Sequence, residues 1–278
     1  MRSGKYIAFI LFLLTAFQLS ASYVVCTTYP IWLMTRAVAG NAPNIAIVLL
    51  MPADCGCAHD YTPAPQDLAK VMQKGTLLIA NGLGLDDHIV NAAKKVNKNI
   101  NVCWAAGYRD KIDAHYFINP GNAKIMLDKI AFILSKDAPD NKDIYYANKV
   151  KYHLQLNELS KQYKQLPLRK SVVLQSSTFI HLAKAANYDI ILAKKEHDAF
   201  LSSSGLQKLL LTIKKQKPYA IWAEKGCIDP VIKMLKKHTK LPVIELDTML
   251  RGVDEPPEDH FIKLMRSNLE TLQKAAKQ

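Results

Sequence analysis

The fold is decided by one uninterrupted stretch, Asp143 to Gln165, which reads DIYYANKVKYHLQLNELSKQYKQ. The stretch contains no glycine or proline, and its apolar side chains keep roughly helical spacing over about six turns. The apolar positions are Ile144, Ala147, Val150, Leu154, Leu156 and Leu159. We therefore predict one long helix that joins two lobes.

Short β-rich runs alternate with helical runs on both sides of this helix, a pattern typical of βα units with mainly parallel sheets. The expected strands are Tyr23 to Cys26, Ile45 to Leu50, Thr76 to Ala80, Ile100 to Trp104, Ser171 to Gln175, Tyr188 to Ala193, Ala220 to Ala223 and Val243 to Leu246. The expected helices include Asn122 to Leu134, Gly205 to Gln216, Asp229 to His238 and Glu258 to Lys277. The predicted fold class is α/β: two (βα) lobes, 22–140 and 167–278, joined by a linker helix at 141–166. A cleft is expected between the lobes, at the carboxyl ends of the strands.

The composition is that of an ordinary globular chain. Of 278 residues, 49% are hydrophobic and 22% charged, which excludes a disordered, collagenous or coiled-coil protein. The formal charge of +13 suits an anionic membrane surface, a membrane complex or nucleic acid. No basic run is interleaved with aromatic residues, so we expect no nucleic-acid partner.

The first 21 residues have the pattern of a signal peptide. Arg2 and Lys5 form a basic segment, Tyr6 to Phe17 is almost entirely apolar, and Leu19-Ser20-Ala21 resembles a cleavage site. An uncleaved anchor is the alternative, but this apolar run falls short of the roughly 20 residues that span a bilayer. We therefore expect residues 1–21 to be removed and the protein to be periplasmic.

The loop Asp54 to Tyr61, DCGCAHDY, is the first candidate metal site. It follows a predicted buried strand, and loops at the carboxyl ends of strands commonly carry ligands. The thiols of Cys55 and Cys57 and the imidazole of His59 are donors suited to zinc or copper. The alternative is a surface loop with a disulfide. A bond between Cys55 and Cys57 would be strained at this spacing, so a third cysteine or a metal is the better partner.

Two further positions could contribute ligands. His115 lies just before the predicted helix that starts near Asn122, and Asp247 ends a predicted buried strand. Their alternative roles are a hydrogen-bonded structural histidine and a turn-capping aspartate.

Eight segments of the mature chain occur in an order and at intervals that closely resemble the zinc/manganese-type substrate-binding proteins of bacterial ABC importers, often called TroA-like or ZnuA-like. These segments are Val24 to Pro30, Val38 to Gly40, His59 to Pro65, Asn81 to Leu85, His115 to Pro120, Ile221 to Glu224, Leu246-Asp247 and Met265 to Leu272. The resemblance implies a rigid linker helix and a single metal ion held between the lobes. The ion would be delivered to an ABC-transporter membrane permease, so the protein would be a binding protein and not an enzyme.

The resemblance also implies a ligand set. Carried over by position, the family's two histidines fall on His59 and His115 and its aspartate on Asp247, while a fourth ligand position falls on Ser176. A neutral hydroxyl is a poor zinc ligand. Three alternatives stay open for the fourth position: water, a thiol of Cys55 or Cys57, or the imidazole of His181.

Zinc is the metal that two histidines favour, with manganese and copper as the alternatives. A position of Cys26 and Cys227 in the same cleft would favour copper. The disulfide pairing of Cys26, Cys55, Cys57, Cys103 and Cys227 stays open. The competing functions are a thiol-based copper-binding or redox protein that uses Cys55 and Cys57, and a metal-dependent hydrolase with Glu224 as its base. We expect a monomer.

Overall fold

The structure is a computed structural model that describes residues 22–73, 76–107, 112–167, 171–193, 202–227 and 229–277. The predicted signal peptide, residues 1–21, lies outside the described residues. Within them, no helix is both long and apolar enough to cross a membrane.

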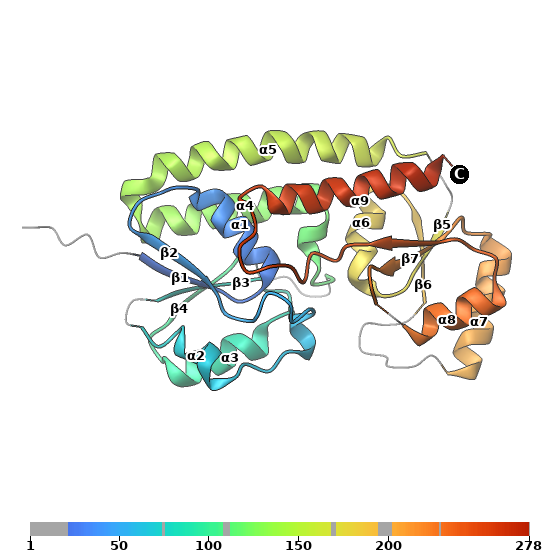
Figure 1. The fold of residues 1–278 in the computed structure, drawn as a ribbon, viewed down its shortest axis with the longest axis horizontal. Coiled ribbons are helices and arrows are strands. Elements are labelled where there is room, and N and C mark those ends of the chain that lie inside the picture. Colours follow the sequence, from blue (N-terminus) through green and yellow to red (C-terminus); the bar gives the residue numbers. More distant parts are fainter. Residues whose placement is uncertain are drawn as a thin grey trace, which may run out of the picture.

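The N-terminal lobe is built on a four-stranded parallel sheet in the order β2-β1-β3-β4. Its strands are β1 (Ser22–Cys26), β2 (Ile45–Leu49), β3 (Leu77–Ala80) and β4 (Asn101–Trp104). Its helices are α1 (Tyr29–Ala39), α2 (Pro65–Ala69), α3 (Asp87–Val96) and α4 (Pro120–Asp137). α1 and α4 cover one face of the sheet and α2 and α3 the other (Figure 1). Covered on both faces, β1 and β3 consist almost entirely of apolar residues.

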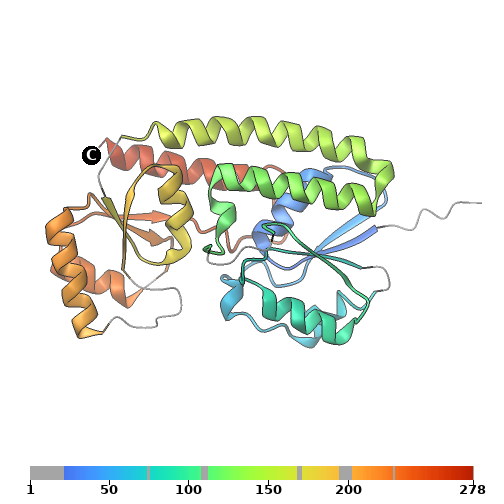
Figure 2. The same ribbon diagram turned by 180° about the vertical axis from the view of Figure 1, so that it is seen from behind.

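The C-terminal lobe repeats this plan with a second four-stranded parallel sheet, in the order β6-β5-β7-β8. Its strands are β5 (Ser171–Leu174), β6 (Asp189–Leu192), β7 (Ile221–Glu224) and β8 (Val243–Leu246). Its helices are α6 (Ile180–Ala185), α7 (Ser203–Gln216), α8 (Pro230–His238) and α9 (His260–Ala276). α6 lies on the side of the sheet nearest the N-terminal lobe (Figure 2). Two parallel α/β lobes are therefore confirmed.

Helix α5 (Lys142–Lys164) runs along both lobes and confirms the predicted long helix (Figure 1). The predicted apolar face is wrong in part, because Val150 and Leu154 are 54% and 67% exposed. The residues that α5 buries are Tyr145, Tyr152, Leu156, Leu159 and Tyr163. Three tyrosines therefore lie on the buried face of α5, whereas Val150 and Leu154, which the sequence analysis placed on the apolar face, are exposed.

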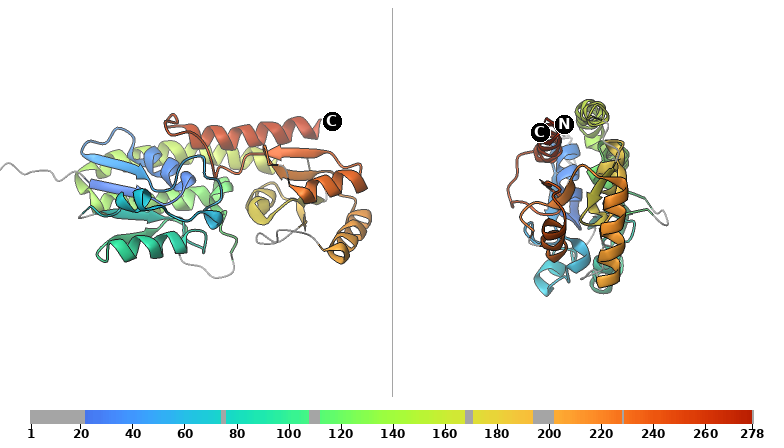
Figure 3. Two further views of the ribbon diagram at one scale, coloured as in Figure 1. Left: turned by 60° about the horizontal axis from the view of Figure 1, so that its bottom comes forward. Right: turned by 90° about the vertical axis from the view of Figure 1, so that its right-hand side faces the viewer.

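The tyrosines suit this face because each has an apolar ring and a hydroxyl group that can reach a backbone carbonyl. Tyr152 donates to Glu258 O at 2.6 Å, and Tyr163 donates to Met265 O at 2.7 Å. Burial, with Glu258 nearby, raises the pKa of Tyr152 to about 12, so its hydroxyl keeps the proton that it donates. These bonds hold α9 alongside α5 (Figure 3).

The chain between β8 and α9 crosses back to the N-terminal lobe. Gly252 N donates to Ala53 O at 2.8 Å, and Arg36 Nη1 donates to Pro256 O at 3.1 Å. The ring of Tyr29 lies so close to Gly252 that a Cβ at this position would be 2.1 Å from the Tyr29 hydroxyl oxygen. Only glycine fits beside this ring.

One apolar core extends from the N-terminal sheet, through α5 and α9, to one face of the C-terminal sheet. A separate, smaller core lies on the other face of that sheet. Because interiors are packed densely, a continuous core resists a large rotation of one lobe against the other. The lobe boundaries predicted from the sequence stay a prediction.

Replacement of Gly252 by alanine should destabilise the protein by about 1–3 kcal/mol, because the new methyl group overlaps the Tyr29 ring. Urea denaturation of the metal-free protein measures this change. Val253→Ala, at the exposed neighbouring position, is the control and should change stability by less than about 0.5 kcal/mol. In a Tyr29→Ala background the cost of Gly252→Ala should fall, and an unchanged cost would show that the ring is not the obstacle.

Candidate metal site

His59 lies in the loop that follows β2. This loop forms a short 3-10 helix, η1 (Ala58–Asp60), in which Ala58 is buried and the His59 ring is half-buried. Gly56 has φ +88°, a conformation that favours glycine, and a Cβ there would be 2.8 Å from Arg251 Nη2. The loop therefore turns sharply beneath the Arg251 guanidinium before it presents His59.

His115 lies in the segment between β4 and α4 and is fully buried. It precedes the 3-10 helix η2 (Tyr116–Ile118), after which the Asn119 side chain caps α4 by accepting a hydrogen bond from Gly121 N at 2.8 Å. Asp113 holds His115 at two points. Its Oδ1 accepts from the His115 backbone N at 3.0 Å and contacts ring Nδ1 at 3.1 Å.

This contact decides which ring nitrogen of His115 can bind a metal. Burial of Asp113 opposes its ionisation, but hydrogen bonding and charge from His115 outweigh that effect, so the pKa of Asp113 is lowered. An ionised carboxylate only accepts hydrogen bonds, so Nδ1 must carry the proton. The lone pair of Nε2 is then available for coordination, the arrangement usual for metal-binding histidines.

The structure brings His59 and His115 together, although they come from loops after different strands. Their ring centroids lie 6.2 Å apart with the rings inclined at 69°, and Nε2 of each ring is shielded from solvent. Two imidazoles in a protected site are suitable donors for zinc and other borderline divalent metals.

Asp247, the third predicted ligand, lies at the end of β8 in a different setting. Its Oδ1 accepts from Met249 N at 2.7 Å, and its main chain forms two hydrogen bonds with the Asn268 side chain, both 2.8 Å long. Among the described residues, no three His, Cys, Asp or Glu side chains lie close enough together to hold one ion. The predicted set of His59, His115, Asp247, Cys55 and Cys57 is therefore not preassembled, and it stays a prediction.

The cysteines are all free thiols. Cys55 is exposed and Cys57 half-buried, both on the His59 loop, while Cys26 is buried in β1 and Cys227 is exposed after β7. Partial burial and the charge of nearby Asp54 raise the pKa of Cys55. A raised pKa disfavours the thiolate that redox chemistry and soft-metal binding both require.

Ser176 and His181, which the sequence analysis considered at or near a fourth ligand position, both form hydrogen bonds within the protein. The Ser176 hydroxyl donates to Thr178 Oγ1 at 3.0 Å. Both ring nitrogens of buried His181 have partners: Nε2 contacts Asp113 O at 2.8 Å, and Nδ1 contacts Asn122 Nδ2 at 3.4 Å. His181 is therefore engaged in a contact between the lobes. The sequence analysis did not predict the contact of Asp113 with His115, although the two residues are only two positions apart.

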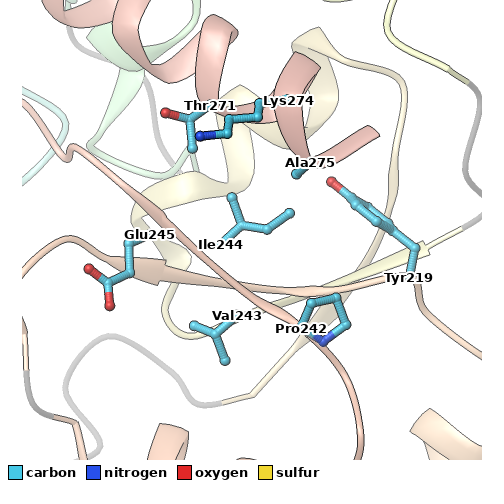
Figure 4. A pocket seen from close by; sticks show the side chains of 8 residues that line it. All are labelled: Tyr219, Pro242, Val243, Ile244, Glu245, Thr271, Lys274 and Ala275. Carbon is cyan, nitrogen blue, oxygen red and sulfur yellow. The ribbon is translucent and has the colours of Figure 1, made fainter. Parts of the chain in front are cut away.

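A cavity of about 720 Å³ lies elsewhere, between the outer edge of β8 and α9 (Figure 4). Its lining residues are Tyr219, Pro242, Val243, Ile244, Glu245, Thr271, Lys274 and Ala275. None of them is a predicted ligand, so this cavity is separate from the histidine pair.

Two parallel α/β lobes bridged by one long helix, with two adjacent histidines from loops of the N-terminal lobe, define a two-lobed binding protein. Residues 24–275 match the family described as zinc-uptake complex component A, periplasmic, and the chain belongs to this family. The family consists of metal-binding substrate-binding proteins of ABC importers, not enzymes.

Individual relatives are distant. The metal ABC transporter substrate-binding lipoprotein ScbA of Streptococcus cristatus is 27% identical over 277 residues, which cover 90% of this chain and 87% of ScbA. The zinc-binding lipoprotein AdcA of Streptococcus pneumoniae is 24% identical over 92% of this chain, which spans only 56% of AdcA. A structure of FpvC from Pseudomonas aeruginosa in complex with Mn2+ has a TM-score of 0.80 at 19% identity and covers 92% of this chain and 98% of FpvC. This last likeness confirms the fold.

The metal-free protein should lose stability as the pH falls from 7 to 5. Burial lowers the pKa of His181, so the folded state keeps this ring neutral while the unfolded chain, with a pKa of about 6.5, takes up a proton. Stability is therefore present above pH 6.5 and declines below it. His181→Gln should show a smaller decline in urea denaturation, and exposed His238→Gln should follow the wild type. Equal declines for all three proteins would contradict this account.

Proposed function

We propose that this protein is a periplasmic receptor that binds zinc through Nε2 of His59 and Nε2 of His115 and delivers it to the permease of an ABC importer. The observation that carries the proposal is the pairing of these two rings, with centroids 6.2 Å apart and with both Nε2 atoms shielded from solvent. Family membership and the predicted signal peptide support transport and an extracytoplasmic site of action.

Each residue has a defined role in the proposed binding step. Asp113 holds the proton on Nδ1 of His115, so that Nε2 is the ring nitrogen that donates its lone pair to the ion. His59 supplies the second imidazole from the loop after β2. We propose Asp247 and water as the oxygen ligands that complete the site once the ion is bound.

Zinc is proposed because two imidazoles suit it and because the relative AdcA is named a zinc-binding protein. Manganese favours a site richer in carboxylates, and copper would favour the thiols of Cys55 and Cys57. The raised pKa of Cys55 argues against a thiol-based function.

Release to the permease would follow from a small rearrangement of the loops at the site. The apolar core continues between the lobes through α5 and α9, and it does not suit a wide hinge motion. Acid would weaken binding, because the metal competes with protons for both imidazoles.

Metal analysis of residues 22–278, purified from a periplasmic extract, tests this proposal. Elemental analysis and native mass spectrometry should find one zinc per chain in the wild type. The His59→Ala/His115→Ala variant should retain less than about a tenth of that zinc, because it lacks both imidazoles.

The Cys55→Ser/Cys57→Ser variant is the matched control, since it alters the same loop and leaves both histidines intact. It should keep its zinc. Copper that survives in the double-histidine variant and is lost in the double-cysteine variant would overturn the proposal in favour of a thiol-based copper protein.

A further inference from the structure

Asp113 is a residue at which the two lobes meet. On one side, its carboxylate holds both the backbone N and ring Nδ1 of His115. On the other side, its backbone carbonyl accepts a hydrogen bond from Nε2 of His181, which belongs to α6 of the C-terminal lobe.

Several contacts fix the position of the His181 ring. The ring is 7% exposed and packs edge-on against Tyr116, with centroids 5.3 Å apart. Its own backbone carbonyl accepts a hydrogen bond from Asn119 Nδ2 at 3.1 Å. Because Asp113 O can only accept, Nε2 of His181 must be the protonated nitrogen, and Nδ1 can then accept from Asn122.

These contacts form a continuous chain from the second lobe to the proposed metal-binding atom. It runs from α6 through Nε2 of His181 to Asp113, then from the Asp113 carboxylate to Nδ1 of His115, whose Nε2 faces the site. The tautomer and orientation of His115 depend on Asp113, so a displacement of α6 would act on the affinity for the ion.

We propose that His181 is a positioning residue, through which the C-terminal lobe controls the metal-binding nitrogen of His115 by way of Asp113. This inference rests on the proposed function. It assigns the C-terminal lobe a part in metal retention without a metal ligand from the turn after β5. In that turn, among the described residues, Ser176 bonds only to Thr178.

Zinc affinity of the full mature chain, measured by competition with a chelator, tests the proposal. His181→Phe fills the same space without the donor and should weaken binding about 10-fold to 100-fold. His181→Gln keeps a donor near the Nε2 position and should restore most of the affinity. Ser176→Ala, which removes a hydroxyl just before α6, is the control and should stay within about twofold of the wild type.

The second readout is the tautomer of His115 in the metal-free protein, measured by nitrogen-15 NMR of the imidazoles. The wild type and His181→Gln should show His115 protonated at Nδ1 alone, whereas His181→Phe should show a mixture of tautomers. A merely structural role for His181 would change the melting temperature without changing this tautomer. If His181→Phe does not fold, His181→Leu, which also lacks a donor, carries the same test against His181→Gln.

Wild-type zinc affinity and a single His115 tautomer in His181→Phe would overturn the proposal. A failure of the proposed function would give a different set of results. Zinc would then be absent from the wild type or would survive in His59→Ala/His115→Ala, while the tautomer measurement would still report on the link from His181 to His115.

Discussion

The contact between the Asp113 carboxylate and Nδ1 of His115 is the interaction on which the rest of the site depends. A histidine that is fully buried can bind a metal only if its proton is on the nitrogen that faces away from the ion. Asp113 meets this requirement, and the same oxygen accepts the His115 backbone N–H, which fixes the main chain as well as the ring. The cap of α4 by Asn119, four residues later, holds the other end of the segment.

The lobes are tied together more closely than two domains on a flexible hinge. Tyr152 and Tyr163 of α5 bond to the backbone at and just before α9, and the segment before α9 returns to the N-terminal lobe beside Tyr29. The side chains of His181 and Asn119 join the lobes again beside the site. Under the proposed function, small changes at this contact are a more suitable means of metal release than a wide separation of the lobes.

Much of the fold could be predicted from the sequence. The strand from Val243 to Leu246 was predicted to the residue, and α5 differs by one residue at each end, because continuous apolar runs and the lack of Gly and Pro are local signals. The buried face of α5 was mispredicted because tyrosine is partly polar and was not counted among the apolar positions. Only the tertiary structure shows that the hydroxyl groups of Tyr152 and Tyr163 donate to backbone carbonyls. No local feature of the sequence indicates that Gly252 packs against the Tyr29 ring.

Part of the candidate site, the approach of His59 to His115, could also be predicted from the sequence. The approach of His59 and His115, 56 positions apart in sequence, follows from the topology of parallel strands, whereas the engagement of His181 with Asp113 depends on how the lobes dock. Zinc-edge X-ray absorption of the zinc-loaded protein tests the central claim most directly, because it counts the atoms bound to the ion. Our account predicts two imidazole ligands, the remainder oxygen and no sulfur, with one imidazole lost in His115→Ala. A sulfur shell at about 2.3 Å, or a shell without imidazole, would contradict it.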